Sequence, residues 1–219
     1  MATRNSLAYQ ARRRAIISFS EKVGLVYFGS VDQHEDDHHS IRGLTASATH
    51  EDSNYSVGSF EGYDVSIVDR LDTLDDNTGH HRTHQWLLFA IDLHAGNDVP
   101  HLFLGTKTRD SSAYTKLFAA FPHFQAAPLG ALSPYPQEFT SRYELYCTPL
   151  QFIEAENFIT PSVSQTIAAH FWPLSVEVFE GSLYLYAGSA SVSQHLLETM
   201  LKNGLWLARQ LDATLESVD

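Results

Sequence analysis

The sequence predicts an α+β protein in which an antiparallel β-sheet with hairpins packs against helices, including a long C-terminal helix. Two turn signals support this class, because Glu61-Gly62 and Glu180-Gly181 each separate two apolar runs, as in β-hairpins. Helical patterns gather mainly in the second half of the chain and do not alternate one by one with strands. This order favours an antiparallel sheet with segregated helices over a doubly wound parallel fold.

In the first half, apolar residues at intervals of four (Leu7, Ala11, Ala15 and Phe19) predict a helix over residues 4–22. Short apolar or alternating runs predict strands at 25–28, 41–48, 86–93 and 102–104, and a hairpin over 57–68. Two polar stretches, residues 32–39 and 69–84, lack apolar periodicity and are predicted to be loops.

In the second half, Asp110-Ser111-Ser112 predicts the start of a helix that ends before Pro122, followed by a connector to Pro136. Alternation over residues 139–146 predicts a strand. Cap residues before prolines predict helices near 149–158 and 161–171, and Glu180-Gly181 joins a hairpin of residues 176–179 and 183–186. The last helix is predicted over about 191–215, with Gly204 in its middle at a close packing contact.

The composition is that of a folded and acidic protein. The chain has 219 residues, 43% of them hydrophobic, and a formal net charge of −12. Binding phosphates requires a basic face, so no nucleic acid partner is expected for the main body. A single cysteine, Cys147, excludes an intrachain disulfide, and no apolar run is long enough to span a bilayer. We therefore expect a soluble cytoplasmic protein.

The chain is most simply one domain with an N-terminal addition. Residues 1–56 form a helix and strand section that is expected to pack on an α+β domain of residues 57–219. Basic residues concentrate at the start, where Arg12-Arg13-Arg14 could meet an acidic partner, the protein's own acidic body, or only solvent.

Four stretches combine hairpin glycines with aromatic and apolar residues: Gly58-Ser59-Phe60-Glu61-Gly62-Tyr63-Asp64-Val65, His84-Gln85-Trp86-Leu87-Leu88-Phe89-Ala90-Ile91, Glu138-Phe139-Thr140-Ser141-Arg142-Tyr143 and Glu177-Val178-Phe179-Glu180-Gly181-Ser182-Leu183-Tyr184-Leu185-Tyr186. Their order resembles a loose family of uncharacterised bacterial α+β domains, a domain of unknown function, over about residues 57–214. Some relatives look membrane-tethered, whereas this chain lacks a spanning segment. The resemblance implies a shared fold, but it implies no reaction and supplies no catalytic residue.

The motif His34-Glu35-Asp36-Asp37-His38 matches the H-E-x-x-H signature of zinc metalloproteases. On a helix, His34 and His38 would bind one zinc ion and Glu35 would polarise the metal-bound water. The flanking segments contain glycine and serine and offer no apolar stripe that could dock such a helix. A polar connection between two strands is the favoured interpretation, and a metal-dependent hydrolase is the alternative.

Histidines are concentrated in one acidic window. Eight of the 12 lie between residues 32 and 98, and His80 and His84 repeat the spacing of His34 and His38. Mixed imidazole and carboxylate ligands suit zinc. Gly79 and Arg82-Thr83 predict a loop, so solvated surface histidines are favoured over a zinc site. A pH response of this window is a further hypothesis.

Aromatic residues of the second half suggest another kind of site. They could line a cavity for a small apolar or aromatic ligand, although such residues more often form a core. The set is Tyr143, Tyr146, Phe152, Phe158, Phe171, Trp172, Tyr184, Tyr186 and Trp206.

The function favoured by the sequence is non-catalytic binding or scaffolding, because no catalytic signature beyond the histidine motif is present. Cys147 is interpreted as a buried small side chain. The partner is left open between another protein and a second copy of the chain. The alternatives are the metal-dependent hydrolase and the small-molecule binder.

Overall fold

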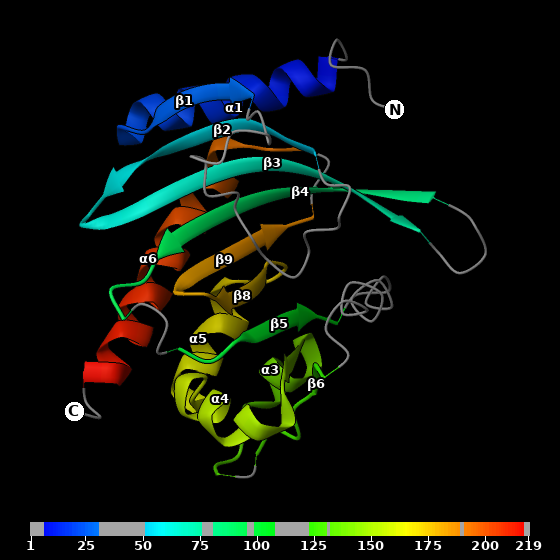
Figure 1. Cartoon of the computed structure of the whole chain (residues 1–219), viewed down its shortest axis with the longest axis vertical. Helices are drawn as coiled ribbons and strands as arrows, with labels where there is room; N and C mark the ends of the chain where they lie inside the picture. Colours follow the sequence, from blue (N-terminus) through cyan, green and yellow to red (C-terminus); the bar gives the residue numbers. More distant parts are fainter. Residues whose placement is uncertain are drawn as a thin grey trace.

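The computed structural model describes residues 7–30, 51–75, 81–95, 99–107, 123–130, 132–188 and 191–216. It shows a single curved sheet with helices packed against it (Figure 1). The predicted α+β class, with an antiparallel sheet and a long C-terminal helix, is confirmed. The predicted strand over 41–48, helix over 110–121 and loop over 32–39 lie outside the described residues.

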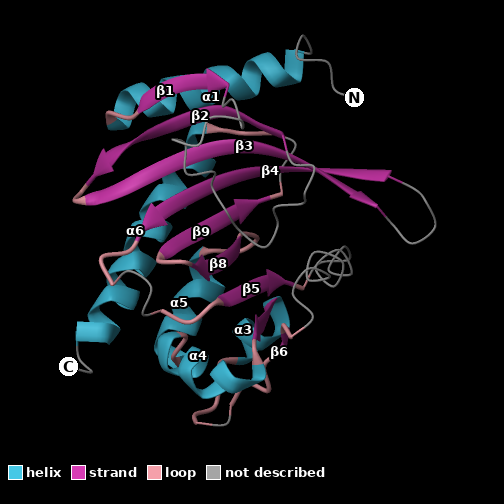
Figure 2. Ribbon diagram, viewed as in Figure 1, coloured by secondary structure: helices cyan, strands magenta, loops and turns pink. Residues whose placement is uncertain are grey.

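The described strands form one sheet in the order β1-β2-β3-β4-β9-β8-β5-β7-β6, and all neighbours are antiparallel (Figure 2). Strands β1 to β4 pair in sequence order and build one half of the sheet, and β9 joins it to the other half by pairing with β4. The strand bounds are β1 Val26–Ser30, β2 Glu51–Phe60, β3 Tyr63–Asp75, β4 His81–Asp92, β5 Leu102–Thr106, β6 Gln125–Ala126, β7 Tyr143–Cys147, β8 Ser175–Phe179 and β9 Ser182–Ala187.

Helices begin directly after both predicted cap residues, Thr148 and Thr160, but only Thr160 makes a side-chain cap hydrogen bond. Thr160 Oγ1 accepts a hydrogen bond from the amide of Val163 at 3.3 Å, which fixes the start of the helix after Pro161. The predicted helices near 149–158, over 161–171 and over 191–215 are confirmed. The helix bounds are α1 Leu7–Val23, α3 Gln137–Arg142, the 3₁₀ helix η3 Pro149–Gln151, α4 Phe152–Phe158, α5 Pro161–His170 and α6 Gln194–Glu216.

The segments Phe60-Glu61-Gly62 and Phe179-Glu180-Gly181 form turns of the same type. Glu61 and Gly62 have φ of 50° and 86°, and Glu180 and Gly181 have φ of 46° and 75°. Two consecutive residues with positive φ define a type I′ turn, whose twist suits a two-residue hairpin and whose second position favours glycine. The shared motif thus reflects a shared backbone requirement at the β2–β3 and β8–β9 hairpins.

Apolar side chains cover both faces of the sheet. The larger core lies on the face covered by helices and includes Phe19 of α1, Ile167 of α5 and Leu207 of α6. A smaller cluster on the opposite face includes Trp86 and Tyr186. Successive residues of β4 and β9 belong alternately to the larger core and to the smaller cluster, because neighbouring side chains of a strand point to opposite faces of the sheet.

Gly204 lies where α6 crosses the sheet. A Cβ atom at this position would lie 2.6 Å from Cδ1 of Ile91 and 2.8 Å from Cδ1 of Leu185. A side chain at this position would push aside the ends of Ile91 and Leu185, so the absence of a Cβ allows α6 to approach β4 and β9 this closely. The predicted close packing contact is confirmed.

The predicted loop over residues 69–84 is wrong for residues 69–75 and 81–84, while residues 76–80 lie outside the described part of the chain. β3 extends through Asp75 and β4 begins at His81, and their ladder continues without interruption from Leu71 opposite Gln85 to Asp75 opposite His81. Charged residues interrupt the apolar alternation that would have predicted this strand pair. Asp69 and Arg70 are buried on the ladder because each pairs with a residue of opposite charge, Arg12 and Asp52 respectively.

The predicted strand over residues 139–146 is wrong in its first half. Residues 137–142 form α3, and β7 starts only at Tyr143. Phe139 and Tyr143 are both buried, and their rings stack with centroids 5.6 Å apart. A spacing of four therefore positions the two rings, and the apparent alternation over this segment does not reflect a strand.

Candidate functional site

The sequence-predicted metal ligands are mostly outside the described part of the chain. His34, Glu35, His38 and His80 lie there, so the metalloprotease motif stays a prediction. His84 belongs to β4, where its backbone lies opposite that of Asp72. Among the residues that the structure describes, no group of three or more His, Cys, Asp or Glu side chains could hold a metal ion.

The structure also locates Cys147 and the nine aromatic residues of the second half. Cys147 is fully buried, and burial raises the pKa of its thiol to about 11, as expected of an inert core cysteine. The nine aromatic residues do not surround one cavity. Tyr143, Phe158 and Phe171 belong to the core under the helices, whereas Tyr184 and Tyr186 belong to the cluster on the opposite face of the sheet.

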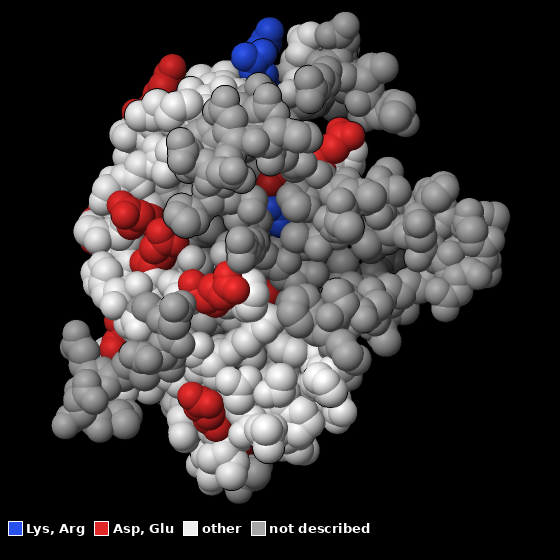
Figure 3. All heavy atoms as spheres, viewed as in Figure 1, with Lys and Arg blue, Asp and Glu red and all other residues white. Residues whose placement is uncertain are grey.

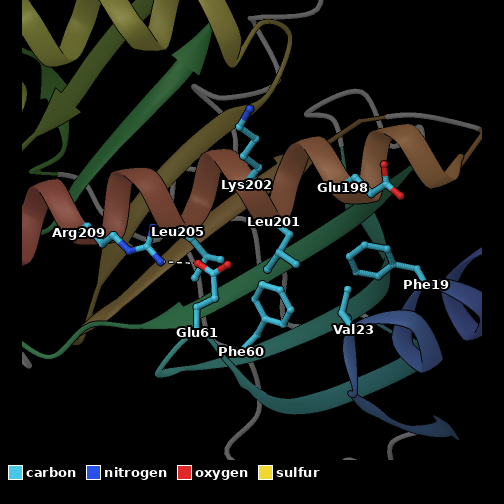
Figure 4. Close-up of a pocket in the computed structure, with 9 residues that line it drawn as sticks. All are labelled: Phe19, Val23, Phe60, Glu61, Glu198, Leu201, Lys202, Leu205 and Arg209. Carbon is cyan, nitrogen blue, oxygen red and sulfur yellow. Dashed lines mark hydrogen bonds and ion pairs between the residues drawn. The ribbon is translucent and has the colours of Figure 1, made fainter.

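A groove instead lies between α1, the β2–β3 turn and α6 (Figure 4). Its volume is about 370 Å³, at the lower end of the range for small-molecule sites. Three segments far apart in sequence meet here. We call this site the α1–α6 groove, and its lining residues are Phe19, Val23, Phe60, Glu61, Glu198, Leu201, Lys202, Leu205 and Arg209.

The floor of the α1–α6 groove is apolar. Phe19, Leu201 and Leu205 are buried, and Val23 and Phe60 are half-buried. Figure 4 shows Phe60 and Leu201 pointing toward one another, with Val23 beside them. The α6 residues recur at helical spacing, so they form one stripe along the helix.

Ion pairs bridge the two sides of the groove. Lys22 Nζ of α1 donates a hydrogen bond to Glu198 Oε1 of α6 at 2.6 Å. Arg209 of α6 donates to Glu61 in the β2–β3 turn. The hydrogen bond from Lys22, and then its positive charge, lower the pKa of Glu198. These contacts tie α6 to α1 at one position and to the hairpin at another.

The chemistry of the lining suits binding. Both carboxylates are engaged by cations, and the nine lining residues include no Ser, Thr, Cys or His. The groove therefore offers apolar contact flanked by charge, and its lining contains no hydroxyl, thiol or imidazole side chain. Sequence patterns do not reveal the groove, because its lining runs from Phe19 to Arg209, which are about 190 positions apart; only the α6 stripe is visible in the sequence.

A second polar cluster lies on the opposite face of the sheet. Glu177 is fully buried in β8, accepts a hydrogen bond from the Tyr186 hydroxyl at 2.5 Å and lies 3.0 Å from His101 Nε2. The His101 ring also contacts the rings of Phe124 and Phe179. Glu177 belongs to β8 and Tyr186 to β9, and His101 directly precedes β5, so neighbouring segments of the sheet satisfy one buried carboxylate.

Charge is unevenly distributed over the surface. Figure 3 shows Asp and Glu spread over the visible face, with basic side chains at the α1 end. Arg12 of α1 is buried against Asp69, with Nε 2.6 Å from Oδ2 and Nη2 2.6 Å from Oδ1. Arg12 thus pairs with the acidic body of the protein itself, whereas Arg13 and Arg14 are exposed.

Fold and groove together define an α+β domain with an open apolar groove between its first and last described helices. No family model and no curated protein matches the chain, so the family resemblance stays a prediction. Among solved structures, the chain is similar to the crystal structure of the mycobacterial trehalose monomycolate transport factor A, TtfA. The TM-score is 0.58 at 13% identity, covering 94% of this chain and 95% of that chain.

At such low identity the similarity shows a shared fold and carries no site residue. The coverage of both chains means that the shared fold includes nearly the whole of each. Within the described residues, no helix is both long and apolar enough to cross a membrane.

Proposed function

We propose that this protein is a non-catalytic binding domain and that the α1–α6 groove is its binding site. The main observation in favour of this proposal is the groove itself. Its apolar floor is open to solvent and lies between the Lys22–Glu198 and Arg209–Glu61 ion pairs. Apolar pockets with a few polar groups at the edge are the usual form of a ligand site. The lining supports binding through burial of an apolar group on Phe60, Leu201 and Leu205.

Similarity to TtfA supports the same kind of role. TtfA is named a transport factor, and transport does not require bond-making chemistry. Because one fold can serve many functions, the similarity supports a binding role in general and specifies no cargo.

The test uses methyl-labelled Val and Leu in the full chain and a panel of small uncharged aliphatic and aromatic molecules. At least one member is expected to shift the NMR signals of Val23, Leu201 and Leu205, which line the groove. Val23→Phe should fill the groove and weaken that binding about tenfold. Shifts confined to other methyl groups, or no shifts with any member, would contradict the proposal.

Val26→Phe is the matched control. Val26 lies on β1, is 57% exposed and does not line the groove, so the same change in side chain leaves the site intact. Unchanged binding in this variant, together with weakened binding in Val23→Phe, assigns the effect to the groove. Circular dichroism of both variants confirms that they fold.

A further inference from the structure

The β3–β4 ladder continues beyond the rest of the sheet as a two-stranded arm. The pairing of β2 with β3 ends at Leu71, and the pairing of β9 with β4 ends at Leu87. Residues 72–75 and 81–84 pair with one another past both ends, and within the described residues no other strand pairs with them. Figure 1 shows these ends of β3 and β4 projecting from the sheet. We call the two segments the β3–β4 arm.

The pairing of two strands alone depends strongly on the residues that lie opposite each other. Two strands are marginally stable in water at best, because independent stability requires a third strand or packing of an apolar face. Residues directly opposite each other on an antiparallel pair have Cβ atoms about 4.5–5.5 Å apart, so charges at such positions interact. Opposite charges there favour the paired arm by about threefold over the state in which its strands are separated.

The register places a histidine opposite an aspartate at two of the four positions of the arm. Asp72 lies opposite His84, and Asp75 lies opposite His81. The other two positions contain no acidic residue and pair Thr73 with Thr83 and Leu74 with Arg82. Protonation of the two histidines therefore converts two register positions of the arm into pairs of opposite charge.

Few other charges lie at or beside the register positions of the arm. Arg82 is the one Lys or Arg in the arm, and Glu51 of β2 lies opposite Leu71 at its base. Asp69 and Arg70, also at the base, are each engaged in a buried ion pair. Carboxyl and guanidinium groups ordinarily keep their charge between about pH 5 and 8, whereas histidine changes its charge in this range. The two histidines therefore determine how the charge of the arm responds to pH.

We infer that the β3–β4 arm is a pH-sensitive element whose strand pairing is strengthened when His81 and His84 are protonated. When the strands separate, neither histidine has an aspartate held opposite it. Protonation therefore favours the paired arm, and this gain is fully present below the ordinary titration range of histidine and is lost as the pH rises through it. The inference is independent of the α1–α6 groove, and it gives the hypothesised pH response of the histidine-rich window a specific location.

Backbone amide exchange in the full chain measures the pairing of the arm. NMR gives protection factors, which compare each exchange rate with the intrinsic rate at the same pH, for residues 72–75 and 81–84. The most protected amides of the arm should have protection factors about three- to tenfold higher at about pH 5.5 than at about pH 8, the combined effect of two cross-strand charge pairs. Equal protection at the two pH values, including no protection at either, would overturn the inference.

Two double variants assign the effect to the histidines. His81→Gln/His84→Gln removes the titrating groups and should show the same low protection at both pH values. His81→Lys/His84→Lys keeps a positive charge at both pH values and should show the same high protection. The matched control, His170→Gln/His195→Gln, removes two exposed histidines of α5 and α6 and should retain the pH dependence of the unmodified protein. A pH dependence that survives in His81→Gln/His84→Gln would also overturn the inference.

Discussion

Arg12 and Asp69 join α1 to the sheet through a buried ion pair. Both side chains are nearly inaccessible, and Asn54 Nδ2 also donates to Asp69 Oδ2 at 3.2 Å. Removing the charge of one partner leaves the charge of the other buried without its counter-ion. Asp69→Asn should therefore lower the free energy of unfolding by about 3–5 kcal/mol.

Urea denaturation measures this loss. The double variant Arg12→Met/Asp69→Leu should recover much of it, because replacing a buried pair by apolar residues is often nearly neutral. The exposed Glu61–Arg209 pair is the control, and Glu61→Gln should change stability by less than about 1 kcal/mol. An Asp69→Asn variant as stable as the unmodified protein would show that the pair contributes little.

Cys147 gives a second prediction at the scale of a residue. Burial raises the pKa of its thiol to about 11, from an ordinary value of 9.0. The folded thiol stays protonated between these values while the unfolded thiol ionises, so stability should fall as pH rises from about 9 to 11. At pH 8 a disulfide reagent should label the thiol only after urea unfolding. Rapid labelling of the folded protein would contradict its burial.

At the scale of elements, Gly204 sets how closely α6 approaches β4 and β9. Gly204→Ala would add a Cβ against Ile91 and Leu185 but gain about 1 kcal/mol of helix propensity, so its net effect should be small. Gly204→Leu adds a whole side chain to a packed core and should destabilise by about 3 kcal/mol or more.

Thermal and urea unfolding of the two variants check the ranking. Gln210→Leu serves as the control, because Gln210 is exposed on the same helix. Equal stability of Gly204→Leu and Gln210→Leu would show that α6 does not depend on this close contact.

Elements that depend on local signals could be predicted from the sequence. Thr160-Pro161 defines the start of α5, and the two Glu-Gly pairs define hairpin turns. The start of this strand extension could not be predicted, because Asp69 and Arg70 are paired with residues that are distant in sequence, Arg12 and Asp52. Local patterns cannot reveal such partners, since burial of a charge depends on the tertiary fold.

At the scale of the whole molecule, the position of the α1–α6 groove could not be predicted from the sequence. Phe19, Phe60 and Leu205 each resemble ordinary core residues in the sequence, and the groove exists only because α1, a hairpin turn and α6 converge. The antiparallel α+β class was predictable because it follows from the order of turns and helices along the chain. Fold class is thus encoded by local pattern, whereas this site is encoded by long-range contacts.

The histidine motif is tested on the whole protein by metal analysis. Mass spectrometry of untagged protein, purified without chelator, measures zinc per chain beside a His34→Ala/His38→Ala variant. We expect no zinc in either sample, because the flanking sequence favours a solvated loop over a helix. About one zinc per chain that is lost in the variant would instead support the hydrolase hypothesis.

The most direct test of the proposed binding site is a crystal structure of the full chain with the small molecule that most strongly shifts the methyl signals of the groove. We predict electron density for this molecule in the α1–α6 groove, in contact with Phe60 and Leu201. An occupied site elsewhere with an empty α1–α6 groove, at a ligand concentration that saturates binding in solution, would contradict the central claim.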